Sequence, residues 1–119
     1  MLKVIEDVKV DIHFSHHSIE RLDRTGLTQC KLQIDDIIPI FYHQTIEGDS
    51  LVWAIQDYIK GPKETELIII DETARISLAI AVFYDYLLQE LNIIIKTIWD
   101  GTDIRIAFGE PVIYTKSVI

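Results

Sequence analysis

Two adjacent histidines stand near the start of the segment FSHHSIERLDRTGLT, residues 14–28, and two arginines follow them. A helix would place His17 and Arg21 on one face, because they are four residues apart, whereas His16 would point about 100° away from His17. Imidazole can transfer protons near neutral pH. His17 is therefore a candidate for acid–base chemistry. The competing interpretation is structural: His17 is then an ordinary residue of a helical first turn.

Other chemistries have weaker support in the sequence. His13, His16 and His17 lie near several acidic residues, but their spacing matches no established zinc signature. Cys30 is the single cysteine, which excludes an internal disulfide and a cysteine-rich zinc site. The chain also has no GxSxG nucleophile motif and no glycine-rich phosphate loop. We therefore expect neither a metal nor a cofactor.

Length and composition predict one globular domain spanning residues 1–119, since 49% of the residues are hydrophobic and 25% are charged. The 19 acidic and 11 basic residues give a formal charge of −8, so binding of RNA or DNA would need a local cationic pocket. The N-terminus is acidic and alternating, unlike a signal peptide. The most apolar run, residues 76–88, is too short to cross a bilayer and contains Asp85. These features predict a soluble, cytoplasmic protein without membrane contact.

The first half of the chain changes from a period of two to helical spacing. Alternation from Val4 to Phe14 predicts one strand. Its apolar face would carry Val8, Val10, Ile12 and Phe14, and its polar face Lys9, Asp11 and His13. Ser15 is a natural N-cap for a short helix that Gly26 should end. A second helix is expected from 34 to 41, kinked or started by Pro39.

The second half is rich in β-branched and aromatic residues. Residues 66–99 are expected to form an antiparallel meander, whereas an alternative makes 74–91 a buried helix between two parallel strands. The preceding segment, 48–62, fits a strand or a helix. Residues 104–115 alternate again and could add an edge strand, with Pro111 at a bulge or margin. The expected fold is therefore α+β: an N-terminal strand and two helices followed by an antiparallel β-meander.

The run FSHHSIERLDRTGLT resembles the opening of a toxin-like domain family allied to the RelE, ParE and BrnT toxins, which have a nuclease-type fold. In that family the segment reads roughly F-S-x-H-A-x-E-R, three or four residues, then R-G-I-(S/T). The matching residues are Phe14, Ser15, His17, Glu20, Arg21, Gly26, Leu27 and Thr28. The run IIIKTIW, residues 93–99, looks like the last strand of the family's meander. The resemblance covers most of residues 12–100, although the second arginine stands at Arg24 and not at the position of Thr25.

The resemblance implies a RelE- or BrnT-like ribonuclease, or an inactive relative of one, that cleaves RNA by attack of a ribose 2′-hydroxyl on the adjacent phosphate. His17 would act as the acid or base, and Arg21 or Arg24 would neutralise the phosphate. RNA or the ribosome would be the partner. The competing structural interpretation makes Glu20 and Arg24 an exposed ion pair on one helix face.

Three residues of the expected last strand complete the implied site. Lys96 and Thr97 would line the wall opposite the helix, and Trp99 could stack on a base. Each also has an ordinary structural interpretation. Lys96 could be an outward residue of an alternating strand, Thr97 a β-former, and Trp99 the cap of a core.

An alternative function follows from the acidic charge. The chain could be a non-enzymatic binding module that occupies a basic protein partner, as immunity proteins, antitoxins and nucleic-acid mimics do. It could also form a homodimer through an edge strand or through an aromatic face containing Tyr84 and Tyr86. A cationic pocket around His17, Arg21 and Lys96 would favour the enzyme instead.

Overall fold

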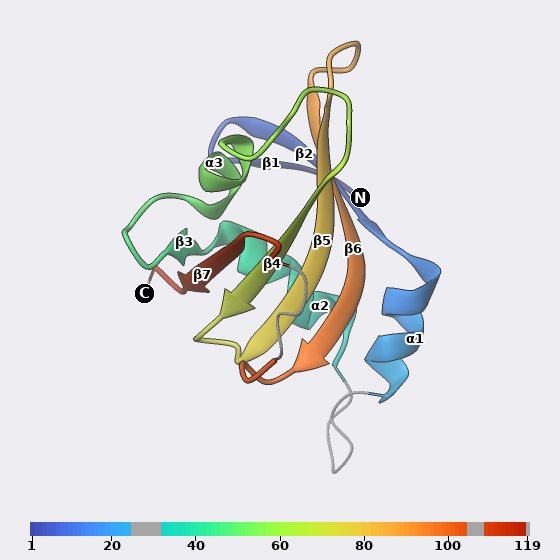
Figure 1. The fold of residues 1–119 in the computed structure, drawn as a ribbon, viewed down its shortest axis with the longest axis vertical. Coiled ribbons are helices and arrows are strands. Elements are labelled where there is room, and N and C mark those ends of the chain that lie inside the picture. Colours follow the sequence, from blue (N-terminus) through green and yellow to red (C-terminus); the bar gives the residue numbers. More distant parts are fainter. Residues whose placement is uncertain (25–31, 105–108, 119) are drawn as a thin grey trace.

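The structure is a computed structural model, and it describes residues 1–24, 32–104 and 109–118. Within these residues the fold is α+β, and seven strands form one curled sheet in the order β1-β2-β6-β5-β4-β7-β3 (Figure 1). The strands are β1 (Leu2–Ile5), β2 (Val8–Phe14), β3 (Gln44–Thr45), β4 (Thr65–Asp71), β5 (Ile76–Asp85), β6 (Glu90–Asp100) and β7 (Val112–Lys116). The helices are α1 (His16–Arg24), α2 (Ile34–Ile37), the 3₁₀ helix η1 (Ile38–Tyr42) and α3 (Leu51–Gln56). None of these helices is long and apolar enough to span a membrane.

The N-terminal segment is a hairpin, and the prediction of one strand from Val4 to Phe14 is wrong. Strands β1 and β2 pair antiparallel around Glu6 and Asp7, whose φ angles are 51° and 65°. Two consecutive positive φ angles give the tight turn whose twist matches that of paired strands. The sequence conceals this turn because it has no glycine or asparagine there. The predicted apolar face of β2 is confirmed, since Val8, Val10 and Ile12 are buried.

Helix α1 begins as predicted. The backbone N–H of Ser18 donates to Oγ of Ser15 at 3.1 Å, which satisfies one of the free donors of the first turn. The hydroxyl of Ser18 donates back to the carbonyl of Ser15 at 2.8 Å. Gly26, the expected end of the helix, lies outside the described residues.

The second predicted helix is divided in two. Helix α2 starts at a capping box in which the backbone N–H of Gln33 donates to the Asp36 carboxylate at 2.7 Å. Pro39 lies in the first turn of η1, where its missing N–H costs nothing, and the chain continues there as a 3₁₀ helix. The ambiguous segment 48–62 contains α3, a helix, which buries Leu51 and Ile55.

The sheet is mixed, so an antiparallel meander does not describe it as a whole. Strands β4, β5 and β6 pair antiparallel in chain order, and residues 76–85 are a strand and not part of a helix. Strand β2, however, pairs in parallel with β6, and β7 pairs in parallel with β4. Alternation along a strand indicates that one face is buried but does not encode the direction of its neighbour. Strand β7 begins directly after Pro111, which is the predicted margin.

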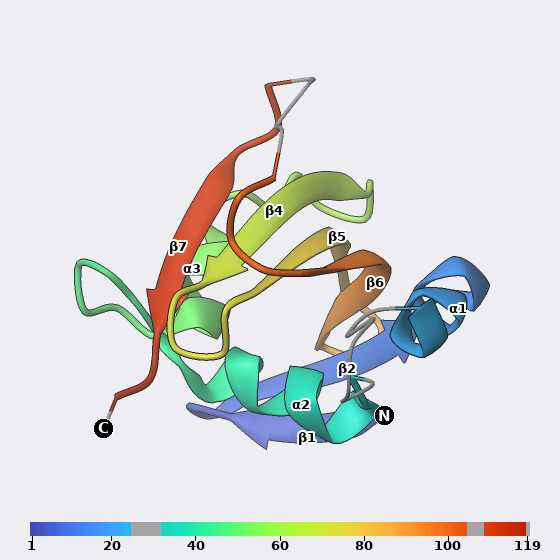
Figure 2. The ribbon, with the colours of Figure 1, turned by 90° about the horizontal axis from the view of Figure 1, so that it is seen from below.

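The core lies on the concave side of the curled sheet, where η1 and the two short helices α2 and α3 pack (Figure 2). Ile37, Ile40 and Phe41 enter it from α2 and η1, and each is fully buried. They meet the inward residues of the strands, such as Val10 and Ile93. Helix α1 lies apart from this cluster of helices, beside the far end of β6 (Figures 1 and 2).

Candidate functional site

Helix α1 is fixed to the edge of β6 beyond the point where β2 stops; we call this region the α1–β6 junction. The backbone N–H of Ser15 donates to the carbonyl of Ile95 at 3.0 Å. The hydroxyl of Ser15 donates to the carbonyl of Lys96 at 3.1 Å. Six residues further along, Nε of Arg21 donates to the carbonyl of Ile98 at 3.1 Å. The donors of Ser15 and Arg21 therefore bond to carbonyl groups of β6 that a neighbouring strand would otherwise pair with.

Strand β6 is irregular at the junction. Ala79 of β5 pairs with Thr97, and the next residue, Ile80, pairs with Ile95. Lys96 is thus the additional residue of a β-bulge. Bulges redirect side chains and occur often beside active sites, although they are also common at sheet margins.

The residues after the bulge resume strict alternation. Ile98 is fully buried in the core, so Thr97 and Trp99 face the opposite, convex side of the sheet. Trp99 pairs with Ser77 of β5 and is partly exposed. The convex side, rather than the core, is where both side chains could meet a ligand.

The two histidines of α1 have different environments. Nε2 of His16 lies 3.0 Å from the Glu20 carboxylate, a contact between exposed residues one turn apart. His17 is exposed. The helix is buried instead through Ser18 and Leu22. The side chain of residue 24, and with it the predicted pair of Glu20 with Arg24, lies outside the description.

The junction brings together segments that are about eighty residues apart in the sequence, as the candidate site required. Helix α1 carries His17 and Arg21, and the adjoining part of β6 carries Lys96 and Thr97. In the part of the chain that the structure describes, neither Arg21 nor Lys96 forms an ion pair with a carboxylate. Within the described ranges, neither positive charge therefore has a carboxylate at salt-bridge distance.

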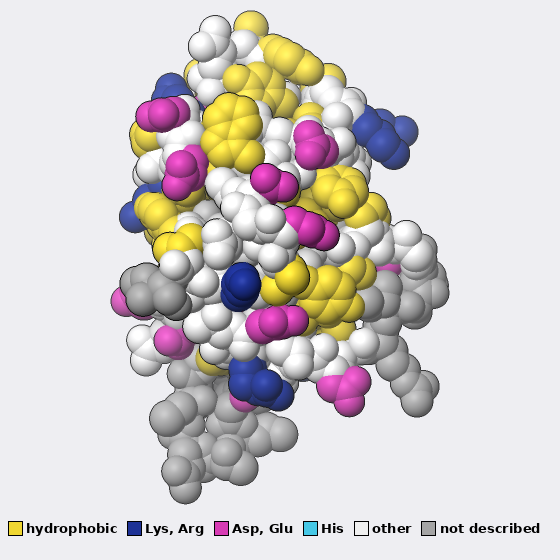
Figure 3. Space-filling view, turned by 90° about the vertical axis from the view of Figure 1, so that its left-hand side faces the viewer, with side chains coloured by type: hydrophobic (Ala, Val, Ile, Leu, Met, Phe, Trp, Pro, Cys, Tyr) yellow, Lys and Arg dark blue, Asp and Glu magenta, His cyan; other side chains and the backbone are white. Residues whose placement is uncertain are grey.

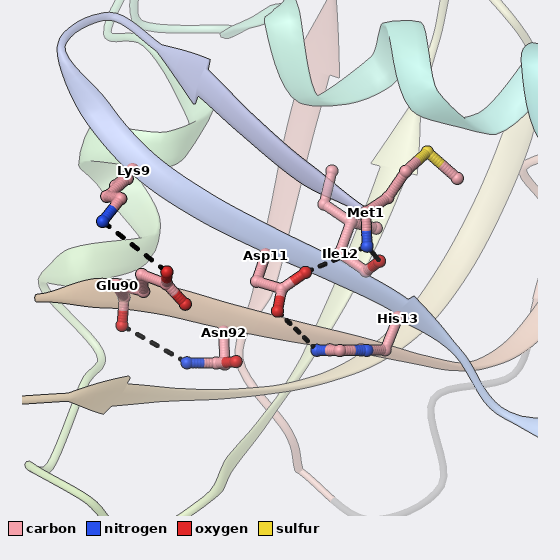
Figure 4. A network of polar contacts seen from close by, with 7 residues as sticks. All are labelled: Met1, Lys9, Asp11, Ile12, His13, Glu90 and Asn92. Carbon is pink, nitrogen blue, oxygen red and sulfur yellow. Dashed lines mark hydrogen bonds and ion pairs between the residues drawn. The ribbon is translucent and has the colours of Figure 1, made fainter. Parts of the chain in front are cut away.

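A second polar cluster lies on the sheet surface of β2 and β6 (Figure 4). Asp11 accepts a hydrogen bond from the N-terminal ammonium group at 2.9 Å, and its other oxygen lies 3.0 Å from Nε2 of His13. The bond from the ammonium group holds the pKa of Asp11 below its ordinary value of 3.8, against the opposing effect of burial, and His13 lowers it further. Lys9 lies 3.7 Å from Glu90. The contacts of Asp11 stay within the N-terminal hairpin, and the pair of Lys9 with Glu90 connects the hairpin to β6.

The sequence analysis missed a third polar group. Nδ1 of His43 lies 2.7 Å from a carboxylate oxygen of Asp71, which is completely buried at the end of β4. The hydroxyl of Thr115 donates to the same oxygen at 2.6 Å, and the N–H of Ala74 donates to the other at 2.7 Å. The carboxylate orients the imidazole and links three segments. The sequence feature that could have revealed this group is Asp71 itself, a carboxylate that directly follows the apolar run LIII, residues 67–70.

A cleft of about 490 Å³ opens beside β7, between the loop after β3 and the end of α3. Its lining includes four exposed carboxylates and two tyrosines but no Lys, Arg or His. The residues that line it are Thr45, Ile46, Glu47, Asp49, Ala54, Asp57, Tyr58, Glu72, Val112, Ile113 and Tyr114. Figure 3 shows the side of the molecule formed by α3, β3 and β7, where acidic side chains are interspersed with hydrophobic ones and with Lys and Arg.

Comparisons with family models, curated proteins and solved structures found no match to this chain. Among the residues that the structure describes, no three His, Cys, Asp or Glu side chains are grouped so that they could hold a metal ion. The geometry of the clusters above is therefore the basis for a functional proposal.

Proposed function

We propose that this protein is a RelE- or BrnT-like domain of the toxin type that acts on RNA at the α1–β6 junction, or is an inactive relative of such a domain. The observation that carries the proposal is the set of three hydrogen bonds that hold α1 against β6. They place a helix with His17 and Arg21 beside a strand with Lys96 and Thr97. These are the residue types that phosphate chemistry without a metal requires.

In the proposed reaction, His17 removes the proton from a ribose 2′-hydroxyl, and the oxygen attacks the adjacent phosphate. The bond from phosphorus to the 5′-oxygen breaks, which leaves a 2′,3′-cyclic phosphate, and the leaving oxygen takes up the proton that His17 removed. Arg21 retains N–H groups beyond the Nε that bonds to β6, because guanidinium has five N–H donors. These N–H groups and the ammonium group of Lys96 would stabilise the charge of the transition state.

The convex side of β6 would bind the bases next to the scissile phosphate. Thr97 and Trp99 face this side, and Trp99 offers an indole ring for stacking. Arg24 remains a second candidate for the phosphate on the basis of the sequence motif alone.

The test is an RNA cleavage assay with purified protein, total RNA and translating ribosomes. We expect His17→Ala to lower the rate of cleavage by about 10² to 10⁴, the usual contribution of a general acid or base. Lys96→Ala should lower the rate while leaving the fold intact, because it removes a charge that has no described partner. Circular dichroism and thermal melting would check that each variant is folded.

Asp103→Ala is the control, because Asp103 is exposed and lies after β6 has ended. This variant should cleave as the wild type does. Equal cleavage by the wild type and His17→Ala would contradict the assignment of His17. If no protein cleaves RNA, the active form of the proposal is wrong.

A second candidate function is the binding of a basic partner protein without catalysis. The acidic cleft beside β7 specifically favours it, because a surface with this charge attracts cations and repels phosphates. A pull-down of a basic protein that weakens with added salt would support this function.

A further inference from the structure

Strand β7 has an edge that is only partly covered. The carbonyls of Pro111 and Thr115 accept hydrogen bonds from β4, from the N–H groups of Ile68 and Glu72. Backbone groups alternate in direction along a strand, so the N–H and C=O groups of residues 112, 114 and 116 point to the other edge. Strand β7 is therefore an interior strand at one end and an edge strand at the other.

Strand β3 occupies only the last part of this edge. It is two residues long, and its Gln44 pairs with Lys116. One further bond follows, from the N–H of Ile46 to the carbonyl of Tyr114 at 3.1 Å, and the chain then turns away at Glu47. Within the described ranges, the N–H of Tyr114 and the outward N–H and C=O of Val112 have no backbone partner. These groups border the acidic cleft.

The walls of the cleft determine the kind of chain that could cover the edge. Glu47 and Asp49 lie on the side of the loop after β3, Asp57 lies at the end of α3, and Glu72 follows β4. All four are exposed. Tyr58 and Tyr114 add aromatic surface that suits the apolar stem or the charge of Lys and Arg.

We propose that the cleft binds an extended, basic segment of a partner protein, which adds to the sheet as a strand beside Val112–Tyr114. The segment continues the line of β3, and its backbone groups bond to the free groups of the β7 edge. Its Lys or Arg side chains face the four carboxylates. The inference deepens the second proposed function, and it does not depend on RNA cleavage.

A second copy of this chain is a poorer occupant. Each copy carries a formal charge of −8, so the approach of another acidic cleft is unfavourable. The free edge is also short, and a self-complementary contact would bring the acidic walls of both copies together. A basic segment gains from the same walls that repel a copy.

The test uses a fluorescent eight-residue peptide of alternating lysine and valine, with binding measured by anisotropy. We expect saturable binding that weakens as salt rises from 50 mM to 300 mM, because exposed charges are increasingly screened. The double variant Asp49→Asn/Asp57→Asn should bind about fivefold more weakly, as expected for the loss of two exposed ionic contacts. Asparagine retains the size of both side chains, and Asp57 is at the C-terminal end of α3, where a negative charge is unfavourable for the helix.

The matched control is Glu6→Gln/Asp7→Asn, which removes two charges from the β1–β2 turn, outside the cleft. It should bind the peptide as the wild type does. If it weakens binding as much as the cleft variant does, the attraction comes from net charge and the cleft assignment is wrong. Equal binding by the wild type and the cleft variant would overturn it as well.

Backbone pairing has its own readout. Only every second N–H of a strand faces its neighbour. Two peptides are therefore compared, one N-methylated at the odd-numbered residues and one at the even-numbered residues. Methylation should weaken binding in one of these peptides and not in the other. Hydrogen exchange at the amide of Tyr114 should slow when the peptide binds. Binding that is insensitive to both methylation patterns, no binding at all, or a dimer of the protein in sedimentation that displaces the peptide would each overturn the proposal.

These outcomes are separable from the other proposals. RNA cleavage by His17 can fail while the peptide still binds at β7. The lysine peptide could also bind in a way that depends on salt but not on Asp49, Asp57 or backbone methylation. That result would support the binding of a basic partner protein and would contradict the assignment of the binding site to this cleft.

Discussion

At the scale of single residues, Asp71 is the polar group on which the fold depends most. It is completely buried. One of its oxygens contacts His43 and accepts a hydrogen bond from Thr115, and the other accepts a hydrogen bond from the N–H of Ala74. Removal of a buried carboxylate leaves its donors without acceptors in a region that water does not reach.

We therefore expect Asp71→Ala to lower the free energy of unfolding by about 3 kcal/mol, within the range for breaking a buried polar network. Urea denaturation followed by circular dichroism measures this change. Asp103→Ala, at an exposed position, should change it by less than about 0.5 kcal/mol. A similarly small effect of Asp71→Ala would show that the buried network contributes little.

At the scale of elements, the attachment of α1 depends on a few polar contacts and a small buried face. Ser18 and Leu22 are the described residues of α1 that are buried, and Arg21 donates a hydrogen bond to β6. Nine residues are too few for an isolated helix to be stable in water, so the helix needs its contacts with β6.

Arg21→Ala should therefore loosen the C-terminal part of α1 and leave the sheet intact. Loss of one hydrogen bond from a charged donor corresponds to about 1.5 to 3 kcal/mol locally. Hydrogen exchange should accelerate at the amides of α1 but not at those of β5. His16→Ala is the matched control in the same helix, because its contact with Glu20 is exposed. Equal exchange in Arg21→Ala and the wild type would show that the bond to Ile98 does not hold the helix.

At the scale of the whole molecule, acid stability should depend in part on Asp11. Its pKa in the folded state is lowered, chiefly by the N-terminal ammonium group, so the unfolded chain binds the proton more readily. The stabilising contribution is thus complete above the ordinary pKa of 3.8, which applies to the unfolded chain, and disappears as the pH falls through the lower, folded pKa.

Asp11→Asn should accordingly be less stable than the wild type by about 0.5 to 1 kcal/mol at pH 7, as for other partly exposed ion pairs. The difference should shrink below about pH 4 and vanish once Asp11 is protonated in both states. Urea unfolding at several pH values measures it. A difference that remains constant down to acid pH would show that the charge of Asp11 is not responsible.

The features that could be predicted from the sequence are those that depend on residues close together in the chain. The alternation in β2, the cap at Ser15 and the role of Pro39 as a residue that kinks or starts a helix depend on local chemistry, and the structure confirms them. The turn at Glu6 and Asp7 was missed because it contains no glycine or asparagine, the residues that usually indicate a turn with positive φ angles. The parallel partners of β2 and β7 were missed because alternation carries no information about distant neighbours.

The candidate site shows the same division. The family resemblance implied that Lys96 and Thr97 line the wall opposite the helix with His17. Helix α1 and strand β6 are adjacent, and the roles of these residues stay predictions. The pair of His43 and Asp71 was missed because it depends on a fold that brings residues 28 positions apart into contact. The free edge of β7 was missed because β3, which covers only part of it, is two residues long.

The parallel pairing of β2 with β6 also has a consequence for the order in which the chain can fold. Residues 10–14 pair with residues 91–95, so a ribosome must synthesise about eighty more residues before β2 meets its neighbour. Until then the hairpin of β1 and β2 lacks both its neighbouring strand and the β6 residues of the core that it completes. Contacts between such distant residues slow folding, since a long loop must close before they form. The N-terminal hairpin is thus made first and incorporated late, and during that interval the unpaired edge of β2 is open to aggregation.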